Sequence, residues 1–191
     1  MSKRKEDMFN EREVKWYVVT TQSGYENTAK INILKRIEPT NLKDTVRQII
    51  VAEIEEEVLN AKNEYVPKKR NLYPGNIFVE MIMNDEMWFI IRNTPGVTGF
   101  IGSSGRGAKP FPVDYEDIEP ILKRLGHIDK KMYDRYNVGD YVRVIDGPLV
   151  GTEGRIITLD RDSGKVQIEA TFFGRVTTAD IDFALIERVD F

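Results

Sequence analysis

The sequence has no cysteine and only one histidine among its 191 residues. Without cysteine there is no disulfide scaffold, no thiol nucleophile and no zinc site built on thiolates. A single histidine excludes every multi-histidine metal site and most histidine-dependent catalysis. The longest uninterrupted apolar run, residues 87–91, is far too short to span a membrane. We therefore expect a cytoplasmic protein that is not an enzyme and needs neither a metal nor another cofactor.

A large excess of charge of either sign is also missing. The chain has 28 basic and 31 acidic side chains, a net charge of −3, which excludes a basic protein that coats RNA. Residues 1–13 carry equal numbers of both signs and no apolar core, so we expect a charged tail and no secretory signal there. Residues 136–191 are acidic, with six basic and ten acidic groups. The overall composition, 41% hydrophobic and 31% charged, is typical of a globular protein of one or two domains.

Residues 14–126 alternate between strand-like and helix-like patterns. Apolar residues recur with period 2 in the expected strands and at i, i+4 in the expected helices. The order β-α-β-β-α-β-α predicts an α+β fold, in which an antiparallel sheet carries helices on one face in a split βαβ arrangement. Strands are expected at 14–21, within 46–59, at 76–83 and at 97–101, and helices at 25–37, 84–92 and 114–125.

Two of these helices have capping signals at their start. Ser23 and Glu26 have the spacing of a capping box, in which both side chains bond backbone groups of the first turn. Asn84 is expected to cap the second helix through its side-chain oxygen. Thr94-Pro95-Gly96 is expected to end that helix.

The pattern changes after residue 126. Residues 127–137 are polar and lack apolar periodicity, which predicts a linker. From residue 138 onward, short strands alternate with glycine- and aspartate-rich turns, and no helix pattern occurs, which favours a small β-barrel. The sequence therefore predicts a tail (1–13), an α+β domain (14–126), a linker (127–137) and a barrel domain (138–191).

Most short motifs in the chain have simple structural explanations. The glycine-rich segment 102–109 lacks the Gly-Lys-Ser/Thr of a phosphate-binding loop, and residues 160–164 lack the glutamate of a calcium loop. His127 lies in the polar segment after residue 126 and is expected to be solvent-exposed. Lys68-Lys69-Arg70, bracketed by Tyr65 and Tyr73, is the only basic cluster with aromatics in the expected domains. It fits a phosphate-binding patch and an ordinary solvated loop equally well.

Several longer motifs, taken together, resemble the NusG family. The N-terminal part is similar to its NGN domain and the C-terminal part to its KOW domain, an SH3-like barrel. The resemblance implies a transcription elongation factor that modulates pausing, termination and antitermination. The motifs that carry it are Trp16–Val19, Ser23–Glu26, Tyr73–Gly75, Arg92–Gly102, Gly139–Pro148, Gly154, Phe173–Arg175 and Asp182-Phe183.

The resemblance also implies partners for the first domain. The NGN domain would bind the clamp helices of the RNA polymerase β′ subunit and reach toward the β subunit, through Trp16, Tyr73, Pro74, Gly75 and Asn76. Asn93 and Thr94 would face the non-template DNA strand of the transcription bubble, where their short polar side chains can bond unpaired base edges. We expect the protein to act as a monomer.

The KOW domain would recruit a small-subunit ribosomal protein and so couple transcription to translation, with the termination helicase Rho as a second candidate partner. Gly154, Phe172, Phe173 and Arg175 are the expected partner-binding residues. Adjacent residues of a strand point to opposite faces, so one of the two phenylalanines is expected to point outward.

The chain departs from the family pattern at a few positions, and two alternatives stay open. Asn76 and Thr152 stand where the family commonly has aromatic residues, and Val51-Ala52 stands where Val-Pro is common. One alternative is a specialised antiterminator confined to a few operons. The other is a ribosome-associated KOW protein that binds RNA, which the acidic barrel disfavours.

Overall fold

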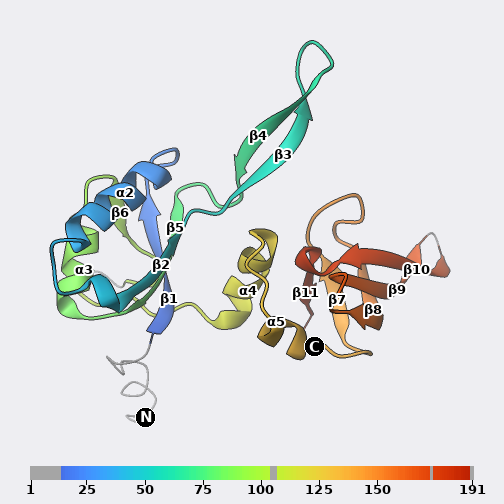
Figure 1. Ribbon diagram of the computed structural model, residues 1–191. Coiled ribbons are helices and arrows are strands. Elements are labelled where there is room, and N and C mark those ends of the chain that lie inside the picture. The colour runs from blue at the N-terminus through green and yellow to red at the C-terminus, as the bar shows by residue number, and fades with distance from the viewer. Residues whose placement is uncertain (1–13, 104–106, 173, 190–191) are drawn as a thin grey trace, which may run out of the picture. The chain divides into compact units, whose positions relative to one another are not determined.

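The structure, a computed structural model, describes residues 14–103, 107–172 and 174–189 (Figure 1). It divides into two compact units, with the boundary between Tyr115 and Glu116. Each unit has its own sheet. Within the described ranges, no helix is long and apolar enough to cross a membrane. The expected charged tail, residues 1–13, lies outside the described residues.

The N-terminal unit is built on a four-stranded antiparallel sheet with the order β2-β5-β1-β6. Helices α2 (Glu26–Ile37) and α3 (Asp85–Arg92) cover one face of this sheet (Figure 1). This confirms the predicted α+β arrangement with helices on one face. The strands are β1 (Val14–Thr21), β2 (Val46–Ile50), β5 (Asn76–Ile82) and β6 (Val97–Phe100).

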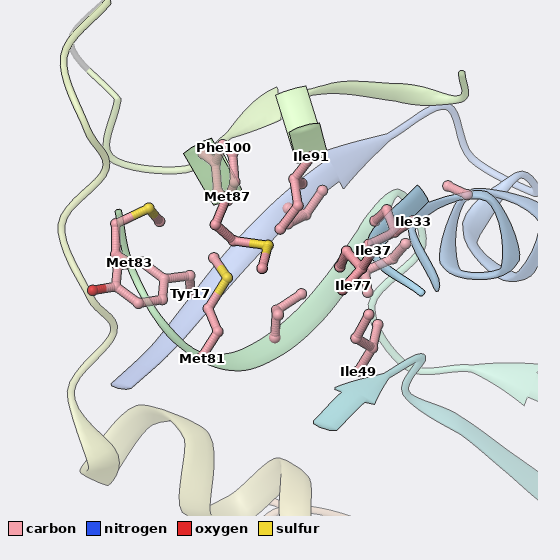
Figure 2. Packing of buried hydrophobic residues seen from close by; sticks show 13 residues of the cluster. Tyr17, Ile33, Ile37, Ile49, Ile77, Met81, Met83, Met87, Ile91 and Phe100 are labelled. Atoms are coloured by element: carbon pink, nitrogen blue, oxygen red, sulfur yellow. The ribbon is translucent and has the colours of Figure 1, made fainter. Parts of the chain in front are cut away.

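The main core lies between this sheet and its two helices (Figure 2). The sheet contributes alternate residues of its central strands, because every second side chain of a strand points to the same face. Helix α2 contributes Ala29, Ile33 and Ile37, the predicted i+4 stripe, and all three are buried. Burying each such aliphatic side chain contributes about 1.5–3 kcal/mol. The other core residues labelled in Figure 2 are Tyr17, Ile49, Ile77, Met81, Met83, Met87, Ile91 and Phe100.

The predicted capping box at the start of α2 is wrong. The residue before α2 is Tyr25, and no side chain caps the helix there. The Glu26 carboxylate instead accepts a hydrogen bond from Gly75 N, 49 positions along the chain. The prediction for α3 is confirmed, since Asn84 Oδ1 accepts from Met87 N at 2.7 Å.

A β-hairpin formed by β3 (Glu53–Leu59) and β4 (Tyr65–Asn71) is a separate two-stranded sheet among the described residues (Figure 1). The acidic run of β3 lies directly across from the basic cluster of β4, with Glu55 opposite Lys69 and Glu56 opposite Lys68. Glu56 also accepts a hydrogen bond from Arg70 Nε at 2.9 Å. The basic cluster is therefore part of a strand that faces carboxylates and not a solvated loop.

The C-terminal unit contains a five-stranded antiparallel sheet with the order β10-β9-β8-β7-β11. Four of its strands were expected, and alternation along β9 buries Val166, Ile168 and Ala170. The short 3-10 helix η3 (Phe183–Leu185) and β11 (Ile186–Arg188) were not expected. The other strands are β7 (Tyr141–Val144), β8 (Glu153–Asp160), β9 (Lys165–Phe172) and β10 (Arg175–Asp182).

Two helices precede the barrel strands. Helix α4 (Tyr115–Arg124) matches the predicted third helix. Helix α5 (Lys130–Asp134) lies within residues 127–137, where a polar linker was expected. Its cap is Asp129, whose Oδ1 accepts from Met132 N at 3.0 Å, and Met132 and Tyr136 are buried. A helix of this length is too short to show apolar periodicity in the sequence.

Candidate functional site

The turn Tyr73-Pro74-Gly75-Asn76 is held rigidly between two neighbouring elements. Asn76 N donates to Tyr73 O at 3.1 Å, which closes the turn. Gly75 has a φ of +80°, the left-handed conformation that the third position of a type II turn requires after proline. Thr21 N donates to Gly75 O at 2.9 Å, so the end of β1 holds the outer side of the turn.

A buried carboxylate holds the other side of this turn. Glu26 Oε1 accepts from Gly75 N at 2.5 Å, and the Glu26 residue is only 5% exposed. Burial alone would raise the pKa of Glu26, but hydrogen bonds from the backbone N–H groups of Gly75, Glu26 and Gly24 outweigh it and lower the pKa. Glu26 is therefore ionised at neutral pH and positions the turn, a role that the sequence did not reveal.

Tyr73 is presented on this rigid turn. Its ring packs edge-on against Phe78, with centroids 5.6 Å apart, and 38% of the residue stays exposed. Its backbone N–H donates to Asn71 Oδ1 at 2.9 Å. The side chain of Asn76 folds back onto the turn, where Nδ2 donates to Pro74 O at 3.2 Å. The turn thus offers one aromatic ring to a partner, and Asn76 supports the turn itself.

Trp16, which was expected to bind the polymerase, is buried. It is 7% exposed, and its carbonyl oxygen accepts from Val113 N at 2.8 Å in a bridge beside β1. Trp16 and Val18 share the face of β1 opposite Tyr17 and Val19, and Val18 pairs directly with Phe78. Trp16 therefore packs within the face of the sheet that carries Tyr73 on Phe78.

The corner after α3 separates the two residues expected to face DNA. Asn93 is exposed, and its Nδ2 donates to Phe89 O at 2.7 Å, which leaves its side-chain oxygen for other partners. Thr94 is 2% exposed, and its hydroxyl donates to Ile90 O at 2.7 Å. The expectation that both side chains are presented is wrong for Thr94, because its polar atom is used to end the helix.

Helix α2 holds this corner in place. Asn32 Nδ2 donates to Pro95 O at 3.2 Å, and Arg36 Nη1 donates to Asn93 O. A Cβ on Gly96 would approach the Ala29 Cβ to 3.3 Å, so glycine permits this close packing. Asn93 is therefore mounted on a braced corner beside the exposed guanidinium of Arg36.

The expected partner-binding residues of the barrel fall into different environments. Phe172 and Arg175 face each other across the turn that joins β9 to β10, with Phe172 half-buried and Arg175 exposed. Phe173 lies outside the described residues. Gly154 is buried, and a Cβ there would come within 2.5 Å of Glu169 O. Gly154 therefore permits the close approach of β8 and β9.

The motifs considered for metal or phosphate binding have structural roles in the described residues. Within these ranges, no group of three His, Asp or Glu side chains is placed to hold a metal ion. Asp160 accepts from Asp162 N and Ser163 N and organises a hairpin turn, as the sequence indicated. Lys109, at the end of the glycine-rich segment, forms an ion pair with Asp85 at 3.0 Å. Residues 104–106 of that segment lie outside the described residues.

Two family profiles match the chain. The profile described as "Transcription termination factor nusG" matches residues 14–122, and the profile "KOW motif" matches residues 138–169. The "Transcription termination/antitermination protein NusG" of Bacillus subtilis is 42% identical over 178 residues, covering 93% of this chain and 99% of the relative. The protein of the same name from Halalkalibacterium halodurans is 38% identical over 179 residues, with the same coverage of both chains.

A solved structure agrees with these relationships. The structure described as "Domain interaction in Thermotoga maritima NusG" has a TM-score of 0.52 and 32% sequence identity. The match covers 95% of this chain and 100% of that chain. The similarity therefore extends over both units and not over one domain alone.

Proposed function

Because the chain belongs to the NusG family of transcription termination/antitermination proteins, we propose that it is a transcription elongation factor that binds RNA polymerase through its N-terminal unit. The proposed contact is with the clamp helices of the β′ subunit, and the unit reaches from there toward the β subunit. The observation that carries this proposal is the exposed Tyr73 ring on its braced turn.

A rigid aromatic anchor suits this role for energetic reasons. Binding hot spots are enriched in tyrosine and tryptophan, and an anchor that is already ordered loses little conformational freedom when it binds. The Tyr73 turn is fixed by Glu26, Thr21 and its own closing hydrogen bond before any partner arrives. Trp16 supports this site from within the sheet.

We also propose that the protein contacts the non-template DNA strand through Asn93. The Asn93 side-chain oxygen and the nearby Arg36 guanidinium offer an acceptor for a base edge and a cation for a phosphate. Thr94 contributes to this site by fixing the corner, since its own hydroxyl is bonded to Ile90.

For the barrel, we propose recruitment of a small-subunit ribosomal protein through the turn between β9 and β10. Arg175 and Val176 are exposed there, and Val176 has 68% of its surface accessible. An arginine beside exposed apolar surface is typical of protein-binding sites. Rho is a second proposed partner of the same barrel.

The binding of core RNA polymerase to the full chain tests the main proposal. Tyr73→Ala is expected to raise Kd about 30-fold, because loss of a hot-spot aromatic costs about 2 kcal/mol or more. Tyr141→Ala is the matched control, since Tyr141 of the barrel has a similar exposure of 39%. Equal affinities for the two variants and the unmodified chain, with Tyr73→Ala still folded, would refute the proposed contact.

A further inference from the structure

An open groove lies between the second half of α2 and the start of β2. The buried side chains of Ile37 and Ile49 line it, one from each element (Figure 2). The groove has a volume of about 770 Å³. Binding pockets for small ligands span ~300–1,000 Å³, so the groove is large enough to receive side chains from another segment.

Other apolar side chains of the groove stay exposed. Ile31 is 52% exposed and Leu34 is 46% exposed, and the two are neighbours on the surface of α2 because they are three residues apart. Val46 of β2 lines the groove as well and is only partly buried. Single exposed apolar residues are common, but several around one hollow are typical of a surface that another segment covers.

The chain enters the N-terminal unit at this groove. Val14, the first residue of β1, is one of the residues that line it. Residues 1–13 precede Val14 and lie outside the family match, which begins at residue 14. A segment that docks in the groove therefore needs no linker between its docked residues and β1.

The sequence before Val14 contains a suitable apolar anchor. Met8 and Phe9 are adjacent, and Phe9 stands five positions before Val14. Five extended residues span about 17 Å at ~3.3 Å per residue, so Phe9 can turn back over the wall that α2 forms. A phenylalanine side chain buries about 150–250 Å² when it packs. It can therefore cover Ile31 and Leu34 together.

Charge at the groove complements the residues next to β1. The groove has three basic and two acidic lining residues, a net charge of +1. Residues 10–13 contain two glutamates and one arginine, a net charge of −1. In the docked segment the two glutamates would pass the exposed ammonium groups of Lys35 and Lys43, and attraction between such exposed charges favours binding weakly. The charged lining residues are Lys35, Glu38, Lys43, Asp44 and Arg47.

We propose that residues 8–13 dock in this groove, with Phe9 as the anchor, as an intramolecular segment of the N-terminal unit. The docked segment covers Ile31 and Leu34 and closes the end of the core between α2 and β2. A tethered segment has an effective concentration on the order of millimolar, so it outcompetes a second copy of the chain at ordinary protein concentrations. The proposal goes beyond polymerase binding and does not depend on it.

Methyl NMR of the full chain tests the docking directly. In the unmodified chain, nuclear Overhauser contacts are expected between the Phe9 ring and the methyl groups of Ile31 and Leu34. A sample that mixes two differently labelled populations separates contacts within one chain from contacts between chains. Contacts that occur only between chains would assign the groove to a second copy and overturn the proposal. The absence of any contact from Phe9 to these methyl groups would overturn it as well.

Substitutions test the part assigned to Phe9. Phe9→Ala is expected to shift the methyl resonances of Ile31 and Leu34 and to speed amide exchange in residues 43–49 about fivefold or more, because the groove is then uncovered. Lys5→Ala, which precedes the docked segment, is the matched control and is expected to change neither. Leu34→Lys alters an exposed position of the groove wall and should abolish the Phe9 contacts while β1 and β5 stay protected. Unchanged methyl resonances and exchange in Phe9→Ala would show that this segment does not occupy the groove.

Discussion

Glu26 and Lys123 are buried ionisable side chains that link distant parts of the chain. Each binds a backbone group far away in the sequence, Gly75 N in one case and Ile186 O in the other. A buried charge that loses such a partner retains the full cost of its desolvation. Both residues are therefore sensitive points for mutation and for pH, in opposite directions.

Glu26→Gln is expected to destabilise the N-terminal unit by about 1–2 kcal/mol at neutral pH, because a charge-assisted hydrogen bond becomes a neutral one. The pKa of Glu26 is lowered in the folded state, so its contribution is present above the ordinary carboxyl pKa and is lost as the pH falls through the folded value. The stability of the variant should therefore fall less at low pH than that of the unmodified chain. Urea unfolding followed by tryptophan fluorescence measures this unit alone, since Trp16 and Trp88 are the only tryptophans. An unchanged acid dependence would contradict the role given to Glu26.

Lys123 is expected to make the C-terminal unit more stable as the pH rises above about 8. Burial lowers the pKa of Lys123 to about 8, against the opposing effects of Glu119 and Glu187. Between that value and the ordinary lysine pKa the unfolded chain binds more protons, so stability rises with pH. The gain should be on the order of 1–2 kcal/mol by pH 9.5, below the range where Tyr133 and Tyr136, whose pKa values are raised, titrate. Lys123→Met should abolish this rise, measured by NMR of barrel amides during urea unfolding. If the stability of Lys123→Met rises with pH by the same amount, another group causes the rise.

Elements with a strong apolar periodicity or a clear capping residue were predictable from the sequence. Elements without either signal were not. Strand β1 was expected with its observed ends, and α3 with its Asn84 cap. Helix α5 and strand β11 are five and three residues long, too short for any pattern to stand out. The Ser23–Glu26 spacing predicted a local cap, but the Glu26 carboxylate accepts a hydrogen bond from Gly75 N, 49 residues away. Such a long-range contact leaves no periodic signal in the sequence.

The candidate site was predictable in its motifs but not in its exposure. The motif around Tyr73 was found through resemblance, and the structure leaves its ring 38% exposed. Trp16, Thr94 and Gly154 occur in equally recognisable motifs, yet all three are buried. A sequence motif does not distinguish an exposed residue that can contact a partner from a buried residue that supports the contact residue.

The corner after α3 gives a prediction that separates these two kinds of residue. Asn93→Ala is expected to shorten pauses several-fold on templates with runs of unpaired non-template bases, because a base contact contributes about 1–3 kcal/mol. Thr94→Val is expected to lower stability, because it leaves the helix end without its hydroxyl, and to shorten pauses less than Asn93→Ala does. In vitro transcription with matched polymerase occupancy measures both. Equal pause lifetimes for Asn93→Ala and the unmodified chain would show that Asn93 only ends the helix and does not contact DNA.

At the scale of the whole molecule, the two units have different chemical characters. The N-terminal unit presents an aromatic ring on a rigid turn and an amide on a braced corner. The C-terminal unit is an acidic barrel with an arginine and apolar surface at the turn between β9 and β10.

Site-specific photocrosslinking tests the central claim, polymerase binding through the Tyr73 turn, most directly. Tyr73 is replaced by p-benzoylphenylalanine, which keeps an aromatic ring at the turn, and the full chain is irradiated in an elongation complex. The same replacement at Tyr141 is the control. We expect a crosslink from position 73 to the clamp helices of β′ and none to that segment from position 141. A bound protein that gives no crosslink from position 73, or one only to another polymerase subunit, would contradict the proposed mode of binding.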